Sequence, residues 1–547
     1  MRSYVFIALA ALTPITAASS QRATTVGAGS PHLLTKNGAV AGVVLPSGVR
    51  VFKGVPFAAP PVRELRWRPP QPVKSWQGVR AADRFADQCM QARVFGDMMF
   101  RNSGVSEDCL YLNVWAPEAR SAAGLPVLFY IYGGGFVAGD GSEPRYDGES
   151  MAKRGIVVVT ISHRLGIFGF FSHPALAAES PQHASGNYGL MDQTAALRWV
   201  QANIGAFGGD PKRVTIAGES AGSFSVSAQM ASPLAKDLLA GAIGESGAFF
   251  STTIPTPAHV ETEQNGVKFG DALSARSLGA LRAFSATEIL EASGRPGVPR
   301  FGPNVDGWFL PEMPSSIFAA GRQAHVPLLA GWNSEESNAR AILNEAPTPE
   351  NTRAQFAKLF GDRAADAAKV FPASTAAEAQ QSLTDLASDR FIGYSTWKWL
   401  DVHARTSGRP VYRYLYAHPR PPLVASMGDA RPGLAGGIVR GGGGNAAPPA
   451  QGAVHSAEIE YALGNLPLNP VFAWSADDHK VSATMQSYFE NFIKTGNPNG
   501  SGLPSWPVGG LNPSGQVQRI RIDVDTRAEL EPRARYLFLD ETYTHPR

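Results

Sequence analysis

Cysteine is nearly absent from this chain of 547 residues, which contains only Cys89 and Cys109. In an exported protein, two cysteines twenty residues apart predict one disulfide, and a pair of buried free thiols is the alternative. No group of cysteines and histidines has the spacing of a zinc site, so the sequence suggests no bound metal.

An excess of charge of one sign is also missing. Lys and Arg number 49 against 46 Asp and Glu, which gives a net charge of +3, and no block of like charges forms a binding tail. Nucleic-acid-binding proteins need a basic patch or stripe, so we expect no nucleic acid partner. Hydrophobic residues make up 44% and charged residues 17% of the chain, a balance that excludes global disorder.

Long hydrophobic runs are missing as well. A membrane-spanning helix needs about 18 apolar residues in succession, and no stretch reaches that length. A short apolar run at residues 4–12 follows Arg2 and precedes small residues at 16–20, which predicts a signal peptide over residues 1–20. A frayed strand or a lipid-facing anchor is the alternative. We therefore expect a secreted or periplasmic protein with no stable membrane anchor.

Three apolar runs predict strands that are buried on both faces of a sheet: residues 126–132 (PVLFYIY), 156–161 (IVVVTI) and 213–217 (RVTIA). Residues 191–204 lie between the last two, have apolar side chains at helical spacing and are followed by Gly205. This strand–helix–strand order predicts an α/β protein with a largely parallel sheet.

Length alone allows two or three domains or one large α/β domain. Residues 260–300 and 350–405 have a helical composition, and we expect them to form caps over one end of the sheet. The Gly- and Pro-rich stretch 431–452 is predicted to be a long loop. We expect residues 21–547 to form a single domain that carries the two cap insertions.

The clearest chemical signal is Gly218-Glu219-Ser220-Ala221-Gly222. It directly follows a predicted strand and precedes a helix-like stretch at 221–230, which is the setting of a nucleophile elbow. Glycines two before and two after the serine let strand and helix approach closely. The alternative is an ordinary Gly-rich turn between a strand and a helix.

A serine hydroxyl needs a base to take its proton and a carboxylate to orient that base. In this type of fold the chain order is serine, acid, histidine. Downstream of Ser220, the acid candidates are Glu335 and Glu336 and the base candidates are His455 and His403. The residues by themselves do not choose within either pair. An ordinary histidine base would make activity rise at about pH 6–7.5.

Acyl transfer also needs donors for the developing oxyanion. Gly133-Gly134-Gly135 ends an apolar strand-like run and supplies backbone amides in a loop. The alternatives are a flexible turn or a phosphate-binding loop, but the Gly-Lys-Ser/Thr sequence of a phosphate loop is missing.

These motifs resemble the type-B carboxylesterases, the cholinesterase-like branch of the α/β-hydrolases. The resemblance covers residues 34–510 and is carried by segments 52–58, 106–114, 132–136, 164–170, 186–193, 208–211 and 218–222. It implies an α/β-hydrolase fold: a large, mostly parallel central sheet with helices on both faces and helical cap insertions.

The resemblance also implies the roles of individual residues. Ser220 is the nucleophile, Glu336 the orienting acid and His455 the base; the amides of Gly134, Gly135 and Ala221 form the oxyanion hole, and Cys89 pairs with Cys109. It implies no cofactor. The family's acid segment reads Gly-x-Asn-x-Asp-Glu-Gly, whereas this chain has Glu335 for the Asp and Ser337 for the last Gly.

The expected function is a serine carboxylic-ester hydrolase that acts on a small-molecule ester. A lipase, thioesterase or amidase with the same triad is the first alternative, and a non-catalytic binding protein on this fold is the second. For a lipase, Phe95, Met98, Met99 and Phe100 in the disulfide loop could line an apolar mouth; equally, they could pack that loop down. The natural substrate and the oligomeric state are left open.

Overall fold

The structure is a computed structural model that describes residues 30–544, apart from 119–120, 122, 252–255, 441–449 and 511–515. The predicted signal peptide therefore lies outside the described residues. Within the described part, no helix is both long and apolar enough to cross a membrane.

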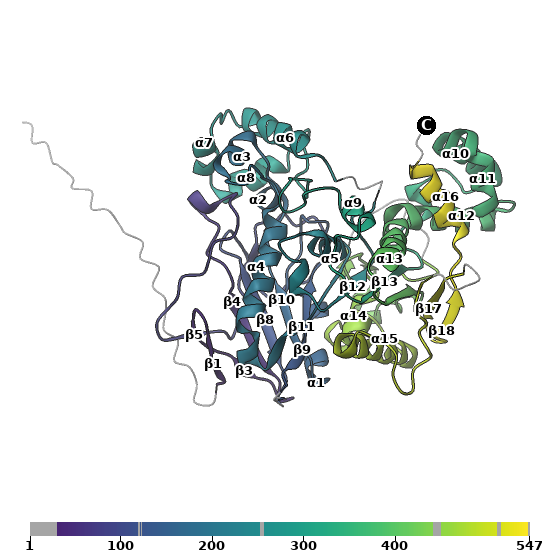
Figure 1. The fold of residues 1–547 in the computed structure, drawn as a ribbon. Helices are drawn as coiled ribbons and strands as arrows, with labels where there is room; N and C mark the ends of the chain where they lie inside the picture. Colours follow the sequence, from purple (N-terminus) through teal and green to yellow (C-terminus); the bar gives the residue numbers. More distant parts are fainter. Residues whose placement is uncertain are drawn as a thin grey trace, which may run out of the picture.

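An eleven-stranded sheet runs through the described part of the chain (Figure 1). Its seven central strands are parallel neighbours, and the strands toward both edges are antiparallel. The predicted strands at 126–132, 156–161 and 213–217 are present as β9, β10 and β11. In spatial order the strands are β18 (Arg527–Leu530), β17 (Gln518–Ile522), β14 (Val411–Tyr416), β13 (Leu328–Asn333), β12 (Gly241–Glu245), β11 (Gly209–Glu219), β9 (Leu125–Ile131), β10 (Val157–Ile161), β8 (Tyr111–Ala116), β4 (Arg50–Pro56) and β3 (Val43–Val44).

Both faces of the sheet are covered, because successive side chains of a strand point to opposite sides. In β9, Val127, Phe129 and Ile131 belong to one apolar core, and Leu128 and Tyr130 belong to the other. The first core includes residues of α2 (Gly166–Phe170), α4 (Tyr188–Asn203), α5 (Ala221–Ala231) and α13 (Tyr394–Thr406). The second includes residues of α1 (Glu149–Lys153), α14 (Ile459–Leu463) and α15 (Ala476–Thr495).

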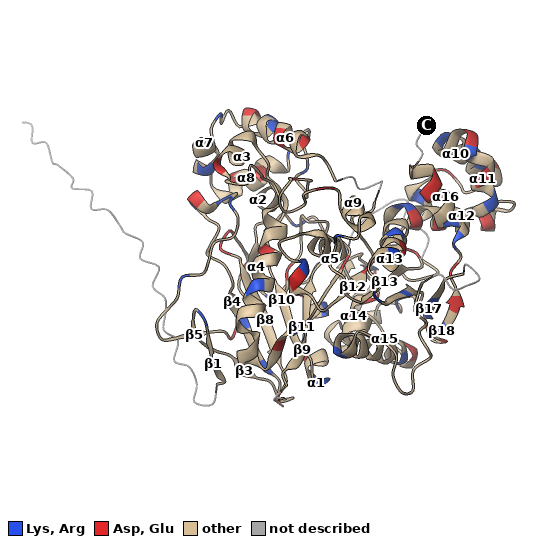
Figure 2. Cartoon of the chain, viewed as in Figure 1, with Lys and Arg blue, Asp and Glu red and all other residues tan. Residues whose placement is uncertain are grey.

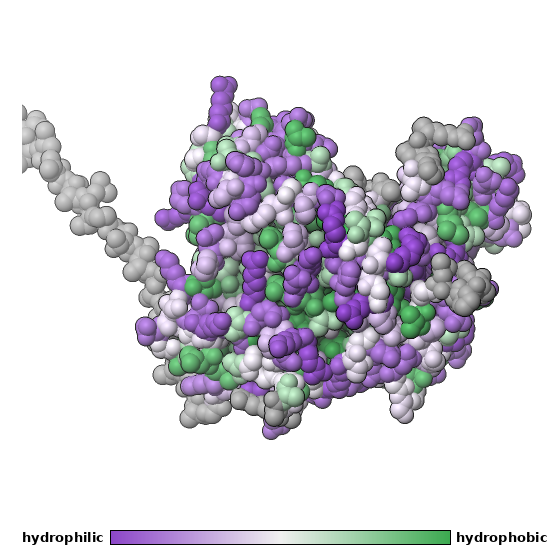
Figure 3. Space-filling model, viewed as in Figure 1, coloured by the Kyte–Doolittle hydropathy of each residue, from purple (hydrophilic) through white to green (hydrophobic). Residues whose placement is uncertain are grey.

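The two segments predicted as caps are helical. Apart from α13, which packs against β13 and β14, their helices lie in two lobes that stand apart at the top of the space-filling view (Figure 3). Both lobes carry Lys and Arg as well as Asp and Glu, and neither lobe is of one charge sign (Figure 2). One lobe contains α6 (His259–Ala272), α7 (Leu278–Ala283) and α8 (Ala286–Ser293) with α3 (Pro174–Glu179); the other contains α10 (Pro349–Phe360), α11 (Ala364–Val370), α12 (Ala376–Ser388) and the C-terminal α16 (Ala534–Thr544). The short α9 (Pro314–Ala319) packs against α5 and α13.

The stretch 431–452 is not the plain loop that its composition predicts. Its first part forms a hairpin in which β15 (Arg431–Pro432) pairs antiparallel with β16 (Ile438–Val439). Strands of two residues are too short to produce an alternating pattern, so the high Gly and Pro content of this stretch predicted a loop throughout. Residues 441–449 of this stretch lie outside the described residues.

Cys89 and Cys109 form the predicted disulfide, and both are buried. The bond closes a loop whose ends pair as β6 (Gln88–Cys89) and β7 (Val105–Ser106). A separate three-stranded sheet of β1 (His32–Thr35), β2 (Gly38–Ala41) and β5 (Val79–Ala81) precedes this loop.

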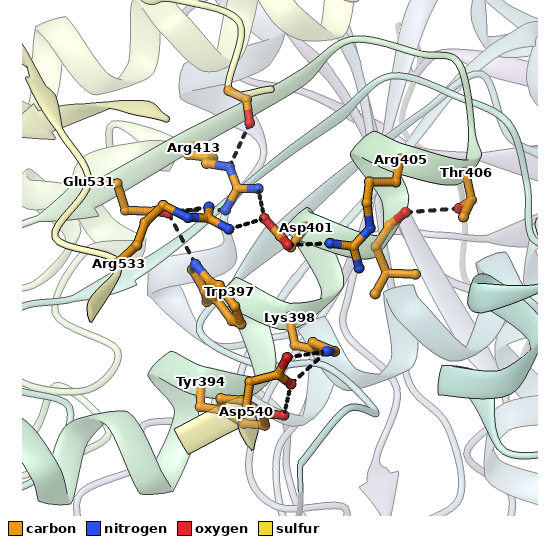
Figure 4. Close-up of polar contacts among 12 residues, drawn as sticks. Tyr394, Trp397, Lys398, Asp401, Arg405, Thr406, Arg413, Glu531, Arg533 and Asp540 are labelled. Atoms are coloured by element: carbon orange, nitrogen blue, oxygen red, sulfur yellow. Dashed lines mark hydrogen bonds and ion pairs between the residues drawn. The ribbon is translucent and has the colours of Figure 1, made fainter. Parts of the chain in front are cut away.

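Buried ion pairs tie α13 to the C-terminal segment (Figure 4). Arg413 on β14 pairs with Asp401 on α13 at 3.1 Å and with Glu531 at 3.3 Å. Arg533 contacts the same two carboxylates, and Trp397 donates its indole N–H to Glu531. The side chains of Arg413 and Glu531 are only 1% and 0% exposed. Because a buried charge without a partner is strongly destabilising, each side chain depends on the opposite charge of the other.

We predict that Glu531→Gln lowers the free energy of unfolding by about 3 kcal/mol, because it leaves buried guanidinium groups short of a counter-charge. Urea unfolding followed by tryptophan fluorescence measures the change. The control is Glu312→Gln, which breaks the exposed pair with Arg322 and should leave stability essentially unchanged. Equal effects of the two substitutions would contradict the prediction.

Candidate active site

Ser220 sits in a strained turn between β11, which ends at Glu219, and α5, which begins at Ala221. Its φ is 54° and its ψ is −121°, a conformation that non-glycine residues rarely adopt. A Cβ on Gly218 would lie 2.6 Å from the carbonyl oxygen of Ile131, and one on Gly222 would overlap that oxygen. Both glycines are therefore required for this turn to pack against β9.

The structure brings Ser220, His455 and Glu336 together. Nε2 of His455 lies 2.9 Å from Oγ of Ser220, and Nδ1 lies 2.6 Å from Oε2 of Glu336. When Nδ1–H donates to the carboxylate, Nε2 is left as the acceptor for the serine hydroxyl. All three are positioned by the carboxyl ends of β11 and β13 and by the segment that precedes α14.

The alternative acid and base candidates, Glu335 and His403, lie away from Ser220. Glu335 turns away from His455 and accepts the backbone N–H groups of Gln451 and Gly452. His403 is fully buried on α13, where Nε2 lies 2.9 Å from the carbonyl oxygen of Val326. Burial lowers the pKa of His403 to about 4. Neither residue contacts Ser220.

The triple glycine lies beside Ser220. A Cβ on Gly133 would be 3.2 Å from Cβ of Ser220, and Gly134 and Gly135 have φ values of 111° and 64°. The amides of these two glycines have no acceptor among the described residues. Ala221 is the first residue of α5, so its amide has no partner four residues earlier in the helix. Three donors are thus available next to the serine.

Further carboxylates surround His455, and the sequence reasoning assigned none of them. Oε1 of Glu219 lies 3.2 Å from Nε2 of His455 and has no hydrogen bond among the described residues. Burial alone would lower the pKa of His455, but the charges of Glu219 and Glu336 outweigh it and raise that pKa to about 9. Burial raises the pKa of Glu219 itself to about 7.

Ser246 links the acid to a deeper carboxyl group. Its Oγ lies 2.5 Å from Oε1 of Glu336 and 3.2 Å from Oε1 of Glu458. Asn333 donates its backbone N–H to Glu336 and its side-chain amide to Glu458. Burial, together with neighbouring negative charges, raises the pKa values of Glu458 and Glu245. Glu458 lies three residues after His455 in the chain, which is the one sequence signal that could have identified it, and Glu245 and Ser246 carry no such signal.

Aromatic side chains adjoin the site. Phe391 lies edge-on to the imidazole of His455, with 5.1 Å between ring centroids. It belongs to a π-helical turn at Asp389–Gly393, which sequence periodicity did not predict. Phe224, one turn into α5 from Ser220, packs edge-on against Phe249 at 5.2 Å, and Phe136 stacks on Phe249 at 6.1 Å.

Three of the four disulfide-loop side chains considered for an apolar mouth pack into one small cluster, and the fourth, Met99, is half-buried outside it. Met98 is 6% exposed and forms a small cluster with Ala138 and Ala435, against which Phe95 and Phe100 pack. Among the described residues, no group of three or more His, Cys, Asp or Glu side chains is arranged to hold a metal ion.

Known proteins are similar to this chain over most of its length. The model of the carboxylesterase family matches residues 29–536. The chain is 36% identical over 488 residues to the fumonisin B1 esterase of Sphingopyxis macrogoltabida, covering 86% of this chain and 83% of that protein. It is 33% identical over 521 residues to the cocaine esterase of Homo sapiens, covering 88% and 86%.

Solved structures are similar over a comparable length. A PNB esterase structure superposes with a TM-score of 0.75 at 30% identity and covers 92% of this chain and 98% of that one. A carboxylesterase of Geobacillus stearothermophilus gives a TM-score of 0.75 at 28% identity and covers 92% and 99%.

We predict that the His455 imidazole titrates near pH 9, because two carboxylates face it. NMR of histidine-labelled protein measures the midpoint, with the buried His403 as an internal reference that stays neutral in this range. Glu219→Gln should lower the midpoint, whereas Glu335→Gln should not. A midpoint at or below the ordinary value of 6.5 would show that burial outweighs the carboxylates.

Proposed function

This chain belongs to the carboxylesterase family and is a carboxylic ester hydrolase of the α/β-hydrolase fold, and we propose that Ser220, His455 and Glu336 perform the reaction through an acyl-enzyme. The observation that carries the proposal is the hydrogen-bonded series from Ser220 Oγ through both ring nitrogens of His455 to Glu336.

In the first half-reaction, Oγ of Ser220 attacks the ester carbonyl while Nε2 of His455 accepts the hydroxyl proton. The negative oxygen that forms is held by the amides of Gly134, Gly135 and Ala221, which are free to donate. His455 then gives its proton to the leaving alcohol. Water repeats the cycle on the acyl-enzyme and releases the carboxylic acid. No step draws on a cofactor.

Glu336 and Glu219 act on the imidazolium that forms in both transition states. Their charges favour the protonated ring, which is why the pKa of His455 is raised to about 9. Only the neutral ring accepts a proton from Ser220, and at pH 7 a pKa of about 9 leaves about 1% of it neutral. The rising limb of kcat/KM in the free enzyme is therefore proposed to lie above the pH 6–7.5 expected for an ordinary histidine.

The proposed substrates are small esters with a neutral acyl group. The aromatic cluster of Phe136, Phe224 and Phe249 supports this, because it joins the segment that follows the triple glycine to the first turn of α5. The negative charges of the buried glutamates would repel an anionic acyl group. Among the residues that the structure describes, no specific contact favours the lipase, thioesterase or amidase alternatives, or a non-catalytic binding role.

Export through a signal peptide over residues 1–20 is also proposed, and the buried disulfide supports an oxidising compartment. The division into one domain over residues 21–547, with caps at about 260–300 and 350–405, stays a prediction.

We predict that Ser220→Ala abolishes ester hydrolysis but leaves the protein folded, because the turn depends on Gly218 and Gly222 rather than on the hydroxyl. Loss of the nucleophile in comparable triads lowers kcat about 10⁶-fold. Hydrolysis of an activated aryl ester and thermal unfolding measure the two outcomes. Substantial activity in a clean preparation would rule out Ser220 as the nucleophile.

We predict that Glu336→Gln lowers kcat by about 10³–10⁴-fold, because a neutral amide does not stabilise the imidazolium. Glu335→Gln is the matched control: it changes the adjacent residue, which contacts Gln451 and Gly452 instead of His455, and should leave kcat near the wild-type value. The opposite ranking in parallel kinetics would identify Glu335 as the acid.

A further inference from the structure

The disulfide loop (residues 90–108) and the hairpin β15–β16 meet at one buried carboxylate. Asp97 is 6% exposed, and its Oδ2 accepts the backbone N–H of Ala435 at 2.5 Å. Side chains at Gly433 and Gly437 would overlap Asp97, so the tip of the hairpin is wrapped closely around this residue. No cationic side chain pairs with Asp97 within the described ranges.

The same hairpin tip contacts the residue that follows the proposed base. Ser456 donates its hydroxyl to the carbonyl oxygen of Leu434 at 2.5 Å. Ser456 has a φ of 63°, a left-handed conformation that costs a non-glycine residue free energy and persists only where neighbours hold it. Arg420 donates to the Ser456 carbonyl at 2.9 Å and fixes the other side of this residue.

The disulfide loop also contacts the proposed oxyanion segment through the next residue. Met98 packs with Ala138 and Ala435, and its Cε lies 3.1 Å from the position of a Cβ on Gly134. Asp97 and Met98 thus lie where the loop contacts both the hairpin and the triple-glycine segment. Burying a carboxylate without a counter-charge costs free energy, so the backbone N–H that Asp97 accepts from Ala435 is an important contact at this junction.

We propose that Asp97 is a positioning residue for ester hydrolysis: it holds the hairpin tip at Ala435, and the hairpin tip holds Ser456 and thereby the imidazole of His455. This inference rests on the proposed role of His455 as the base. A small displacement of a catalytic group lowers kcat strongly without removing the substrate site, so the effect is on kcat rather than on KM.

The first experiment compares Asp97→Ala with Asp97→Asn, using an activated aryl ester and burst titration of active sites. Asp97→Ala should lower kcat by about tenfold or more with KM changed by less than about threefold. Asp97→Asn should retain most of kcat, because its amide oxygen can still accept the Ala435 N–H. The control is Asp87→Ala, which removes a bond to Ser103 at the base of the same loop and should leave kcat unchanged.

The second experiment tests whether Asp97 and Ser456 act in series. Ser456→Ala breaks the contact with Leu434 and should lower kcat on its own, which also keeps the proposal testable if Asp97→Ala does not fold. The double variant should be no slower than the slower single variant. The proposal would be overturned by a double variant whose loss of kcat is the product of the two single losses. It would also be overturned by an unchanged kcat in Ser456→Ala or Asp97→Ala, or by an Asp97→Asn enzyme as slow as Asp97→Ala.

Ser220→Ala in the same assay separates this proposal from the one on which it rests. An active Ser220→Ala enzyme would overturn the catalytic assignment itself. An inactive Ser220→Ala enzyme alongside an unaffected Asp97→Ala enzyme would overturn the positioning role alone.

Discussion

The close approach of Gly222 to the backbone of β9 is the constraint on which the site depends. The carbonyl oxygen of Ile131 occupies the space that a Cβ on Gly222 would need. This contact aligns the carboxyl ends of β9 and β11, which are parallel neighbours in the sheet. The triple glycine leaves β9 at the same edge where Ser220 leaves β11, so donors and hydroxyl become neighbours through backbone packing alone.

A cluster of buried carboxyl groups controls the charge of His455. Glu219, Glu336 and Glu458 are buried, and the charge of each raises the pKa of His455. Burial raises the pKa values of Glu219 and Glu458, and the neighbouring carboxylates raise them further, because like charges oppose one another's ionisation. The cluster favours a positive charge on His455, which is the charge that forms when a serine proton is transferred.

Much of the fold and part of the site could be predicted from the sequence, and the limits have physical causes. The buried strands and the elbow follow from local patterns, because apolar runs, glycines and a serine stand next to one another in the chain. Glu336 could be separated from Glu335 only through the register of a family resemblance, since the choice depends on where the backbone turns after β13. Glu219, Glu458 and Phe391 were not predicted as site residues, because their proximity to His455 arises from packing between distant segments. The strand β15 was not predicted, because a strand of two residues has no periodic pattern.

The order of the site residues along the chain has a consequence for folding. Ser220, the triple glycine and their strands lie within the first half of the sequence, whereas Glu336 and His455 come from segments more than a hundred residues further on. Each of these contacts closes a loop of more than a hundred residues, and contacts between distant segments form more slowly than local ones. A refolding chain that has completed β9, β10 and β11 therefore has its hydroxyl in place without a base. Recovery of esterase activity would then lag behind recovery of the central sheet, and would report the docking of the C-terminal half of the chain.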